Sequence, residues 1–439
     1  MDLIKWPFLK QSWGMEVIRS EGSYLYTKEG QKILDAAGGA IVSNIGYGRD
    51  EVAEAVKQAT KNNSYVLPPF LTPERESLLD ELREHWLPSH LTRIHLSSGG
   101  SEANESAIKL AIQYQASRGK PEKNMILTRT LSYHGTTLNM SGISGHTARK
   151  RGLESYVPKA PMIETPYPLR CPIGSFHPDA KDYYLNNLKE VLQEVGAENI
   201  AALLMEPING SSGGAISPPE GYWEEAQKIL IDNDILLIAD EVMTGFGRVG
   251  EDFASNLYNL KPDILVAGKG MGGGYAAIGG TYSTDEIADS IMAAGYEVMF
   301  HTFAALPQSC AASSAVLKIL REEQLCDRVN PLGEKIMDQL NSEVGQHPNV
   351  AEVRGKGLLI GIEIVKEKEG LICFDEDEKV TSQIMMKGLE DGVFLYPGGT
   401  GEFRDIICLG PAFTIGDGEI ELMVNAVKNS LNYIANKYS

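Results

Sequence analysis

The chain has 439 residues and a formal net charge of −19 at pH 7. This length corresponds to roughly two or three domain-sized units. A content of 43% hydrophobic and 23% charged residues is ordinary for a globular protein. The strong negative charge argues against binding to nucleic acid or to an anionic membrane. It does not exclude an anionic small molecule, because one local basic group can bind such a ligand.

The cysteines and the amino terminus indicate the compartment. The five cysteines are widely spaced and odd in number, so they predict reduced thiols rather than a disulfide framework or a metal site. Residues 1–13 contain no apolar core of signal-peptide length. No stretch reaches the ~18 uninterrupted apolar residues of a membrane-spanning helix. We therefore expect a cytoplasmic protein.

The first part of the chain is predicted to hold two short strands and then two helices, at residues 23–27, 32–36, 50–61 and from 72 or 73 onward. Asp50 is expected to cap the first helix, because its side chain can accept a hydrogen bond from the free amides of the first turn. Two prolines at 68 and 69 separate the helices.

From Ile94 the pattern alternates between strands and helices. The predicted strands lie at 94–98, 125–127, 201–205, 235–239 and 264–267, and the clearest helices at 101–117 and 222–232. This alternation indicates a large α/β domain with a mostly parallel sheet flanked by helices. The runs at 235–239 and 264–267 have the length and branched composition of buried parallel strands.

A helix is predicted near 307–323, and the pattern changes after about residue 325. A long helix, strands at 358–364, 393–396 and 406–409, and a helix at 380–390 follow. These elements form an α+β unit that we expect to complete a small domain together with the amino-terminal strands. The predicted division is 1–60 for the first part of the small domain, 61–325 for the large domain and 326–439 for the rest.

Two central strands are each followed by a charged residue. Asp240 ends the run at 235–239, and Lys269 follows the run at 264–267. Chemistry in open α/β sheets lies at the carboxyl ends of strands, so this carboxylate and this amine suggest a site. Pyridoxal phosphate (PLP) needs such a pair, an amine to hold its aldehyde as a Schiff base and a carboxylate to keep its ring nitrogen protonated. Val242 would contact the ring. Taken singly, either charge is more often an ordinary surface residue at the end of a core strand than a catalytic one.

A glycine turn precedes the helix at 101–117. Gly99 and Gly100 permit close approach of the backbone, and Ser101 stands at the helix amino terminus. Free amides and the helix dipole attract an anion there. The turn therefore predicts a phosphate cradle, with a plain helix cap as the alternative.

The full pattern resembles a known family. Asp-Glu-Val at 240–242, Thr-Gly-Phe-Gly-Arg at 244–248 and Gly-Lys-Gly at 268–270 are similar to the signature of the class III aminotransferases. These are PLP enzymes of fold type I, and the likeness is to their ω-aminotransferase branch. It extends from about residue 22 to the end. It implies a large domain with a seven-stranded type of sheet, mostly parallel, and a small α+β domain built from both termini.

The resemblance also implies roles for single residues. Gly100 and Ser101 match the motif that holds the cofactor phosphate. Tyr133 and His134 match a motif whose aromatic residue stacks on the pyridine ring. Glu206 matches a glutamate that braces the site. Thr302 matches a threonine that reaches across a dimer interface to the phosphate of the partner's cofactor.

Several positions depart from the family patterns and bear on the substrate. Ile41 stands where amine-type enzymes often carry a tryptophan, and residues 209–214 lack the glutamate of the ornithine and γ-aminobutyrate branches. The strand near 411–415 lacks a mobile arginine, for which Arg404 is a substitute candidate. Recognition of a substrate carboxylate is thus unassigned. The apolar character of residues 65–70 and Ile41 favours a substrate with a hydrophobic part, unless these residues form a dimer interface.

The resemblance implies PLP-dependent transamination. Lys269 would hold the cofactor, yield to an incoming amine and then move the proton, so that an amino group passes from an amine or ω-amino compound to a keto acid or aldehyde. The alternatives are an epimerase, an aminomutase or a decarboxylating transaminase on the same scaffold, and a binding protein without catalysis. The expected partners are small amine and keto acid substrates and a second copy of the chain. We expect a homodimer with shared active sites, or a dimer of dimers, and no nucleic acid or membrane partner.

Overall fold

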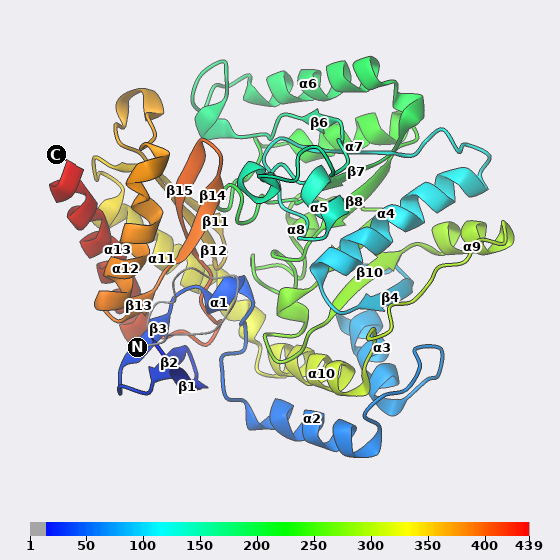
Figure 1. The fold of residues 1–439 in the computed structure, drawn as a ribbon, viewed down its shortest axis with the longest axis horizontal. Helices are drawn as coiled ribbons and strands as arrows, with labels where there is room; N and C mark the ends of the chain where they lie inside the picture. The colour runs from blue at the N-terminus through cyan, green and yellow to red at the C-terminus, as the bar shows by residue number, and fades with distance from the viewer. Residues whose placement is uncertain (1–14, 439) are drawn as a thin grey trace.

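The structure is a computed structural model that describes residues 15–438. The prediction about residues 1–13 lies outside that range. The elements form one seven-stranded sheet with helices on both faces and two four-stranded sheets beside it, at the left of Figure 1. None of the helices within residues 15–438 is both long and apolar enough to cross a membrane.

The large sheet contains the predicted central strands. Its order is β4 (Arg93–Ser97), β10 (Gly279–Ser283), β9 (Ile264–Ala267), β8 (Leu236–Asp240), β7 (Ile200–Met205), β5 (Met125–Arg129) and β6 (Met162–Ile163). Only β10 runs against its two neighbours, and the pairs from β9 to β6 are all parallel. The predicted mostly parallel sheet is confirmed, and β8 and β9 are adjacent, parallel and fully buried.

Helices cover both faces because successive strand residues point to opposite sides. In β8, Ile238 packs with α4 (Gly100–Ser117), α5 (Leu138–Ile143) and α9 (Asp285–Ala293) on one face. Its neighbours Leu237 and Ala239 pack with α6 (Ala180–Val195) and α7 (Tyr222–Asp232) on the other. The short α8 (Ala254–Leu257) lies between β8 and β9 in the chain.

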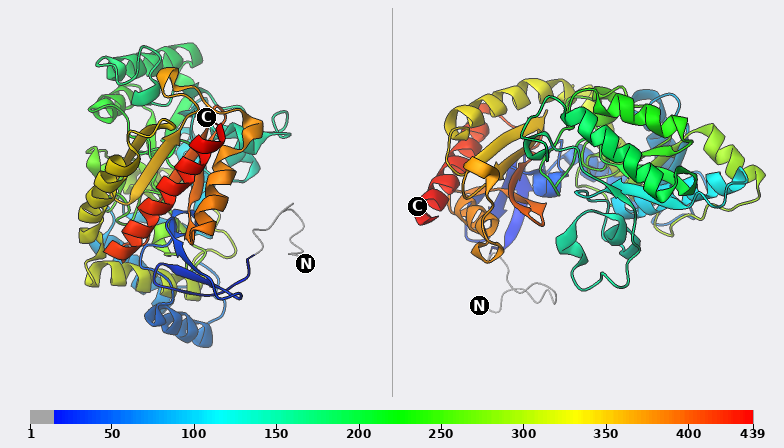
Figure 2. Two further views of the ribbon diagram at one scale, coloured as in Figure 1. Left: turned by 90° about the vertical axis from the view of Figure 1, so that its left-hand side faces the viewer. Right: turned by 90° about the horizontal axis from the view of Figure 1, so that it is seen from above.

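The two ends of the chain meet in one of the smaller sheets. β1 (Val17–Glu21), β2 (Tyr24–Thr27) and β3 (Lys32–Asp35) are completed by β13 (Val393–Phe394), which pairs with β3 in parallel. The other sheet has the order β11 (Val350–Lys356), β12 (Leu359–Ile364), β15 (Phe403–Leu409) and β14 (Tyr396–Thr400), all antiparallel. Three helices lie beside this sheet, α11 (Val329–Val344), α12 (Val380–Glu390) and α13 (Asp417–Tyr438) (Figure 2).

Three further helices complete the fold, α2 (Asp50–Asn62), α3 (Pro73–His85) and α10 (Pro307–Glu322), after the single turn α1 (Gly38–Ile41). α2 and α3 both pack against α10. We propose to keep the domain boundaries near residues 60 and 325, with α2 as the link between the two parts.

Some sequence predictions need correction. Asp50 does not cap α2 but is its first residue, and Arg49 holds the cap position without a side-chain hydrogen bond. Thr72 does cap α3, where its hydroxyl accepts from the Arg75 amide at 3.4 Å. The strand predicted at 393–396 is divided between β13 and β14, with Leu395 between them.

Candidate active site

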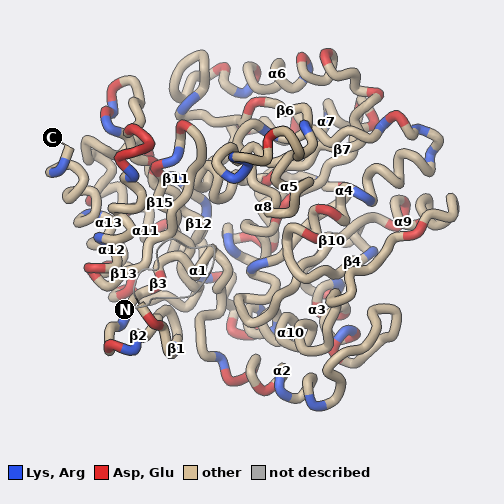
Figure 3. Tube along the Cα trace, viewed as in Figure 1, with Lys and Arg blue, Asp and Glu red and all other residues tan. Residues whose placement is uncertain are grey.

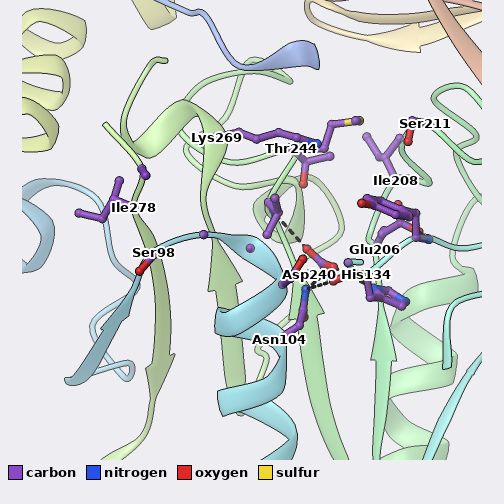
Figure 4. Close-up of a pocket in the computed structure, with 18 of the residues that line it drawn as sticks. Ser98, Asn104, His134, Glu206, Ile208, Ser211, Asp240, Thr244, Lys269 and Ile278 are labelled. Carbon is purple, nitrogen blue, oxygen red and sulfur yellow. Dashed lines mark hydrogen bonds and ion pairs between the residues drawn. The ribbon is translucent and has the colours of Figure 1, made fainter. Parts of the chain in front are cut away.

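Asp240 and Lys269 reach one cavity from adjacent strands. Asp240 is the last residue of β8, and Lys269 follows β9 after Gly268. Both line the cavity together with six other predicted residues, namely Gly100, Ser101, Tyr133, His134, Glu206 and Val242 (Figure 4). Lys269 has φ of 39°, a conformation that costs free energy for a residue with a side chain and is concentrated at functional sites.

The Asp240 carboxylate is fixed by three donors. Its Oδ2 accepts from Asn104 Nδ2 at 2.9 Å and lies 2.8 Å from His134 Nδ1, and its Oδ1 accepts from the Val242 amide at 3.1 Å. Asn104 also donates to the His134 carbonyl at 3.0 Å. An ionised carboxylate only accepts, so His134 donates through Nδ1. Asp240 is therefore a buried, preoriented acceptor at the end of β8.

Lys269 is half-buried, and its amine has no hydrogen-bond or ion-pair partner among residues 15–438. Burial lowers its pKa from the ordinary 10.5 to about 8, although the negative charges of Asp240 and Glu206 act to raise it. A lysine with this pKa is partly neutral near physiological pH, and the neutral amine is the nucleophilic form.

Glu206 lies just after β7 and holds the neighbouring loops. Its Oε2 is 3.3 Å from the guanidinium of Arg129 and accepts from the Tyr133 amide at 3.3 Å. Its Oε1 accepts from the Gly210 amide at 2.9 Å. Burial raises the pKa of Glu206, while His134 and Arg129 act to lower it. The contact to the Tyr133 amide ties the backbone of that residue to β7.

The amino terminus of α4 opens into the cavity. Gly99 holds the cap position, Gly100 and Ser101 form the first turn, and the Ser101 hydroxyl accepts from the Thr136 amide at 3.1 Å. A Cβ on Gly100 would lie 2.9 Å from Val242 Cγ1. Gly135 has φ of +148°, and a Cβ there would lie 2.6 Å from Ser101 Oγ. Only glycine fits these positions, and the free amides of the turn form a site for an anion.

Thr302 is the one predicted residue that the structure does not bring into the cavity. It is exposed, in the segment between α9 and α10. Within one chain, the apolar positions expected at the pocket entrance also lie elsewhere. Ile41 is buried in the core beside Phe394 and Cys408, and Pro68 to Phe70 line a separate cavity with Phe300.

Several lining residues had no role assigned from the sequence, among them Ser98, Asn104, Ile208, Ser211, Met243 and Thr244. Asn104 carried a signal, because it lies one turn into a helix whose amino terminus was already assigned to the site. Ser211 carried none, since its position depends on how residues 207–216 fold beside β14, where the Gly399 amide donates to its carbonyl at 2.7 Å.

The cavity offers the groups that PLP requires. An anionic acceptor, the Lys269 amine and a helix amino terminus kept open by glycines surround it. Asn104 Oδ1 and His134 Nε2 are buried nearby and have no hydrogen-bond partner within the described part of the chain, residues 15–438. The donor set therefore fits PLP, which is a phosphorylated pyridine aldehyde. The site and the fold together define the class of protein as PLP-dependent enzymes of fold type I.

Comparisons with known proteins agree with this class. Residues 10–431 match the family "Aminotransferase class-III". The protein named "Uncharacterized aminotransferase YodT" from Bacillus subtilis is 34% identical over 413 residues, 92% of each chain. Putrescine–pyruvate aminotransferase from Pseudomonas aeruginosa is 31% identical over 422 residues, 95% of this chain and 91% of that one.

A solved structure of an amine transaminase from an uncultivated Pseudomonas species, in its PLP-bound form, superposes with a TM-score of 0.91. It is 30% identical, and the match covers 99% of both chains. The chain belongs to the class III aminotransferases. It is a PLP-dependent transaminase of fold type I, as the resemblance implied.

Proposed function

We propose that this transaminase moves the amino group of a small amine or ω-amino compound to a keto acid or an aldehyde. The meeting of Asp240 and Lys269 in one cavity carries the proposal (Figure 4). A relative that is named for putrescine and pyruvate supports an amine donor and a keto acid acceptor.

Lys269 would hold PLP covalently through its amine. The unusual pKa of about 8 lets Lys269 release and regain a proton near neutral pH. Once the substrate amine displaces it, the free Lys269 amine would act as the base and acid that moves the proton. When bound, PLP supplies a protonated pyridine ring that stabilises negative charge on the substrate carbon.

The other residues would bind and orient the cofactor. Asp240 would keep the ring nitrogen protonated, and His134 and Asn104 fix that carboxylate through their hydrogen bonds. The first turn of α4, with Gly100 and Ser101, would bind the phosphate. Tyr133 and Val242 would contact the ring, and Glu206 would hold the Tyr133 backbone.

We also propose a homodimer, alone or as a dimer of dimers, in which Thr302 serves the partner's phosphate. Two adjoining segments expose large apolar side chains, and the rings of Tyr65 and Phe303 lie 6.4 Å apart. The exposed residues are Tyr65, Leu67, Phe70, Leu71, Tyr296, Val298, Met299, Phe300 and Phe303. Apolar patches of this kind mark interfaces between proteins. The five cysteines are all free, which supports a reducing compartment such as the cytoplasm.

The test is a half-reaction screen. PLP-loaded enzyme is mixed with single amines, without an acceptor, and its absorbance is followed. A transaminase converts the bound PLP to pyridoxamine phosphate with a donor alone. The screen then adds pyruvate, 2-oxoglutarate or an aldehyde and measures the return of the PLP spectrum. Turnover of amines without any pyridoxamine phosphate would contradict the proposal and favour an epimerase or an aminomutase. A decarboxylating transaminase also forms pyridoxamine phosphate, and release of carbon dioxide from the donor would identify it.

A further inference from the structure

Arg149 lies beside the cavity without a carboxylate partner. It belongs to the single turn η1 (Thr147–Lys150), which follows α5, and Figure 3 shows basic residues beside that helix. Its guanidinium carbon is 4.5 Å from the centre of the Tyr133 ring. No acidic side chain of residues 15–438 lies within ion-pair distance of Arg149, although the chain as a whole carries 59 acidic residues against 40 basic ones.

Charge from Arg149 reaches the reacting groups. Its guanidinium acts to lower the pKa values of the Tyr133 and Tyr396 phenols, although burial raises both pKa values overall. Arg149 also contributes to the lowered pKa of Lys269, after burial as the main cause. The positive charge is thus within electrostatic range of the amine that performs the chemistry.

The turn that carries Arg149 is fixed to the small domain. Thr400, at the end of β14, accepts from the Ala148 amide at 3.3 Å and lies 3.0 Å from His146 Nδ1. β14 also carries Tyr396. Arg149 is exposed, and its guanidinium lies near two tyrosines, Tyr133 from the cavity wall and Tyr396 from β14.

Other arginines near the cavity already have acceptors. Arg129 pairs with Glu206. Arg404, the substitute candidate from the sequence, donates to the carbonyls of Gly401 at 2.7 Å and Phe374 at 3.4 Å. Among residues 15–438, the Arg149 guanidinium is hydrogen-bonded to the Tyr133 and Tyr396 phenols but to no carboxylate. A carboxylate is a stronger acceptor than a phenol and binds a guanidinium through two parallel hydrogen bonds.

We propose that Arg149 binds the carboxylate of the amino-group acceptor, an α-keto acid, and of the amino acid formed from it. This inference rests on the proposed function, because a keto acid acceptor presents its carboxylate beside the carbon that reacts. Arg149 is a specificity-determining residue: it selects acceptors with a carboxylate over plain aldehydes.

The test uses single turnover and needs no knowledge of the amine donor. Apoenzyme is loaded with pyridoxamine phosphate and mixed with pyruvate or with propanal, which has the same carbon count and no carboxylate. We expect Arg149→Met to lower the second-order rate constant for the reaction with pyruvate 10- to 100-fold. Loss of a hydrogen bond between charged groups usually has an effect of this size. The value for propanal should stay within about twofold. Arg149→Lys keeps the positive charge but not the forked guanidinium. Its rate constant with pyruvate should lie between those of wild type and Arg149→Met.

Arg151→Met is the matched control. Arg151 lies two positions further on, is exposed and pairs with Glu376 at 2.6 Å, so its replacement should change neither acceptor. An equal loss with pyruvate and propanal in Arg149→Met would overturn the proposal and show that Arg149 merely positions Tyr133. An unchanged rate with pyruvate would overturn it as well.

A binding measurement separates this inference from the proposed function. Calorimetry on the PLP-loaded enzyme compares propionate with neutral propionamide. Wild type should prefer propionate, and Arg149→Met should lose that preference. If wild type transaminates nothing, the proposed function has failed, and the propionate preference still decides the role of Arg149. Equal binding of both probes by wild type would overturn the assignment of a carboxylate site.

Discussion

Two features of Lys269 cost free energy, and a residue without a catalytic role would not need them. Its φ of 39° is unfavourable for a residue with a side chain, and its half-buried amine has no hydrogen-bond partner among residues 15–438. The lowered pKa expresses the second cost, because burial destabilises the ammonium form. Covalent attachment to an aldehyde would remove that charge, so cofactor binding relieves part of the cost.

The lowered pKa predicts how cofactor uptake depends on pH. Since only the neutral amine attacks an aldehyde, the rate at which apoenzyme gains the visible absorbance of lysine-bound PLP should rise with pH and level off above about 8. An ordinary lysine would give a rise that continues towards pH 10. Stopped-flow absorbance between pH 6 and 10 measures this. Lys269→Ala is the control and should show no such band at any pH, and no turnover.

Asp240→Asn should retain PLP but lose most of its activity. The amide keeps the size of the side chain and removes the charge that would stabilise the protonated ring nitrogen, an effect of roughly 1.4 kcal/mol for each pKa unit. We expect the single-turnover rate to fall by about a hundredfold or more. Cofactor content and thermal unfolding of the variant serve as controls. Near-normal single turnover would refute the role given to Asp240.

At the scale of elements, the site depends on how closely loops approach α4. Gly135 permits the loop after Tyr133 and His134 to lie against Ser101, at a φ that only glycine adopts easily. We therefore propose that the amino terminus of α4 and a loop from the next strand jointly build the phosphate cradle. Its shape depends on a glycine in that loop as much as on its own serine.

Gly135→Ala should weaken cofactor binding. A Cβ there would lie 2.6 Å from Ser101 Oγ, so Ser101 must shift. We expect the dissociation constant for PLP to rise at least tenfold, as measured by equilibrium titration of apoenzyme. Gly119→Ala is the matched control, with φ of +77° and nothing within 4 Å of its Cβ. Both changes should cost about 1–2 kcal/mol of stability from the backbone conformation. Equal PLP affinity in the two variants would contradict the joint cradle.

The sequence predicts elements well where pattern and burial agree. β8, β9 and α4 were located within a residue or two, because their apolar runs and the glycine turn determine them locally. β10 was not predicted. It begins with two glycines, which are poor strand formers, and a Cβ on Gly279 would lie 2.8 Å from the Gly99 carbonyl. That contact joins residues far apart in the sequence, so no local sequence pattern predicts it. Arg149 was missed for a similar reason, since only the fold brings η1 beside Tyr133.

At the scale of the whole molecule, the exposed apolar segments and Thr302 lie together between α9 and α10 and before α3. A second subunit would cover them, and an interface upwards of ~2,000 Å² in total is expected of an obligate homodimer. Thr302 lies outside the cavity of its own chain. An active site shared between two subunits would give Thr302 a function, whereas its position within a single chain does not suggest one.

Complementation tests the shared site. Lys269→Ala protein and Thr302→Trp protein, each inactive, are mixed, unfolded and refolded together. If sites are shared, each mixed dimer holds one site with both lesions and one with neither. Activity should return to about a quarter of wild type, because half of the dimers are mixed and one of their two sites is intact. Either variant refolded alone is the control. Activity that stays at background in the mixture would show that Thr302 acts within its own chain.

The pairing of β3 with β13 has a consequence for how the chain is made. β13 follows the strands of the large sheet in the chain, whereas β1, β2 and β3 precede them, so β13 is synthesised long after its partner strand. Until then β3 presents an unpaired edge, of the kind that recruits strands from other chains. The nascent large sheet can assemble in the meantime, because its strands lie within residues 93–283. A ribosome that stalls after residue 325 therefore releases a chain with a complete catalytic sheet and an open amino-terminal edge. For such a fragment, aggregation competes with folding.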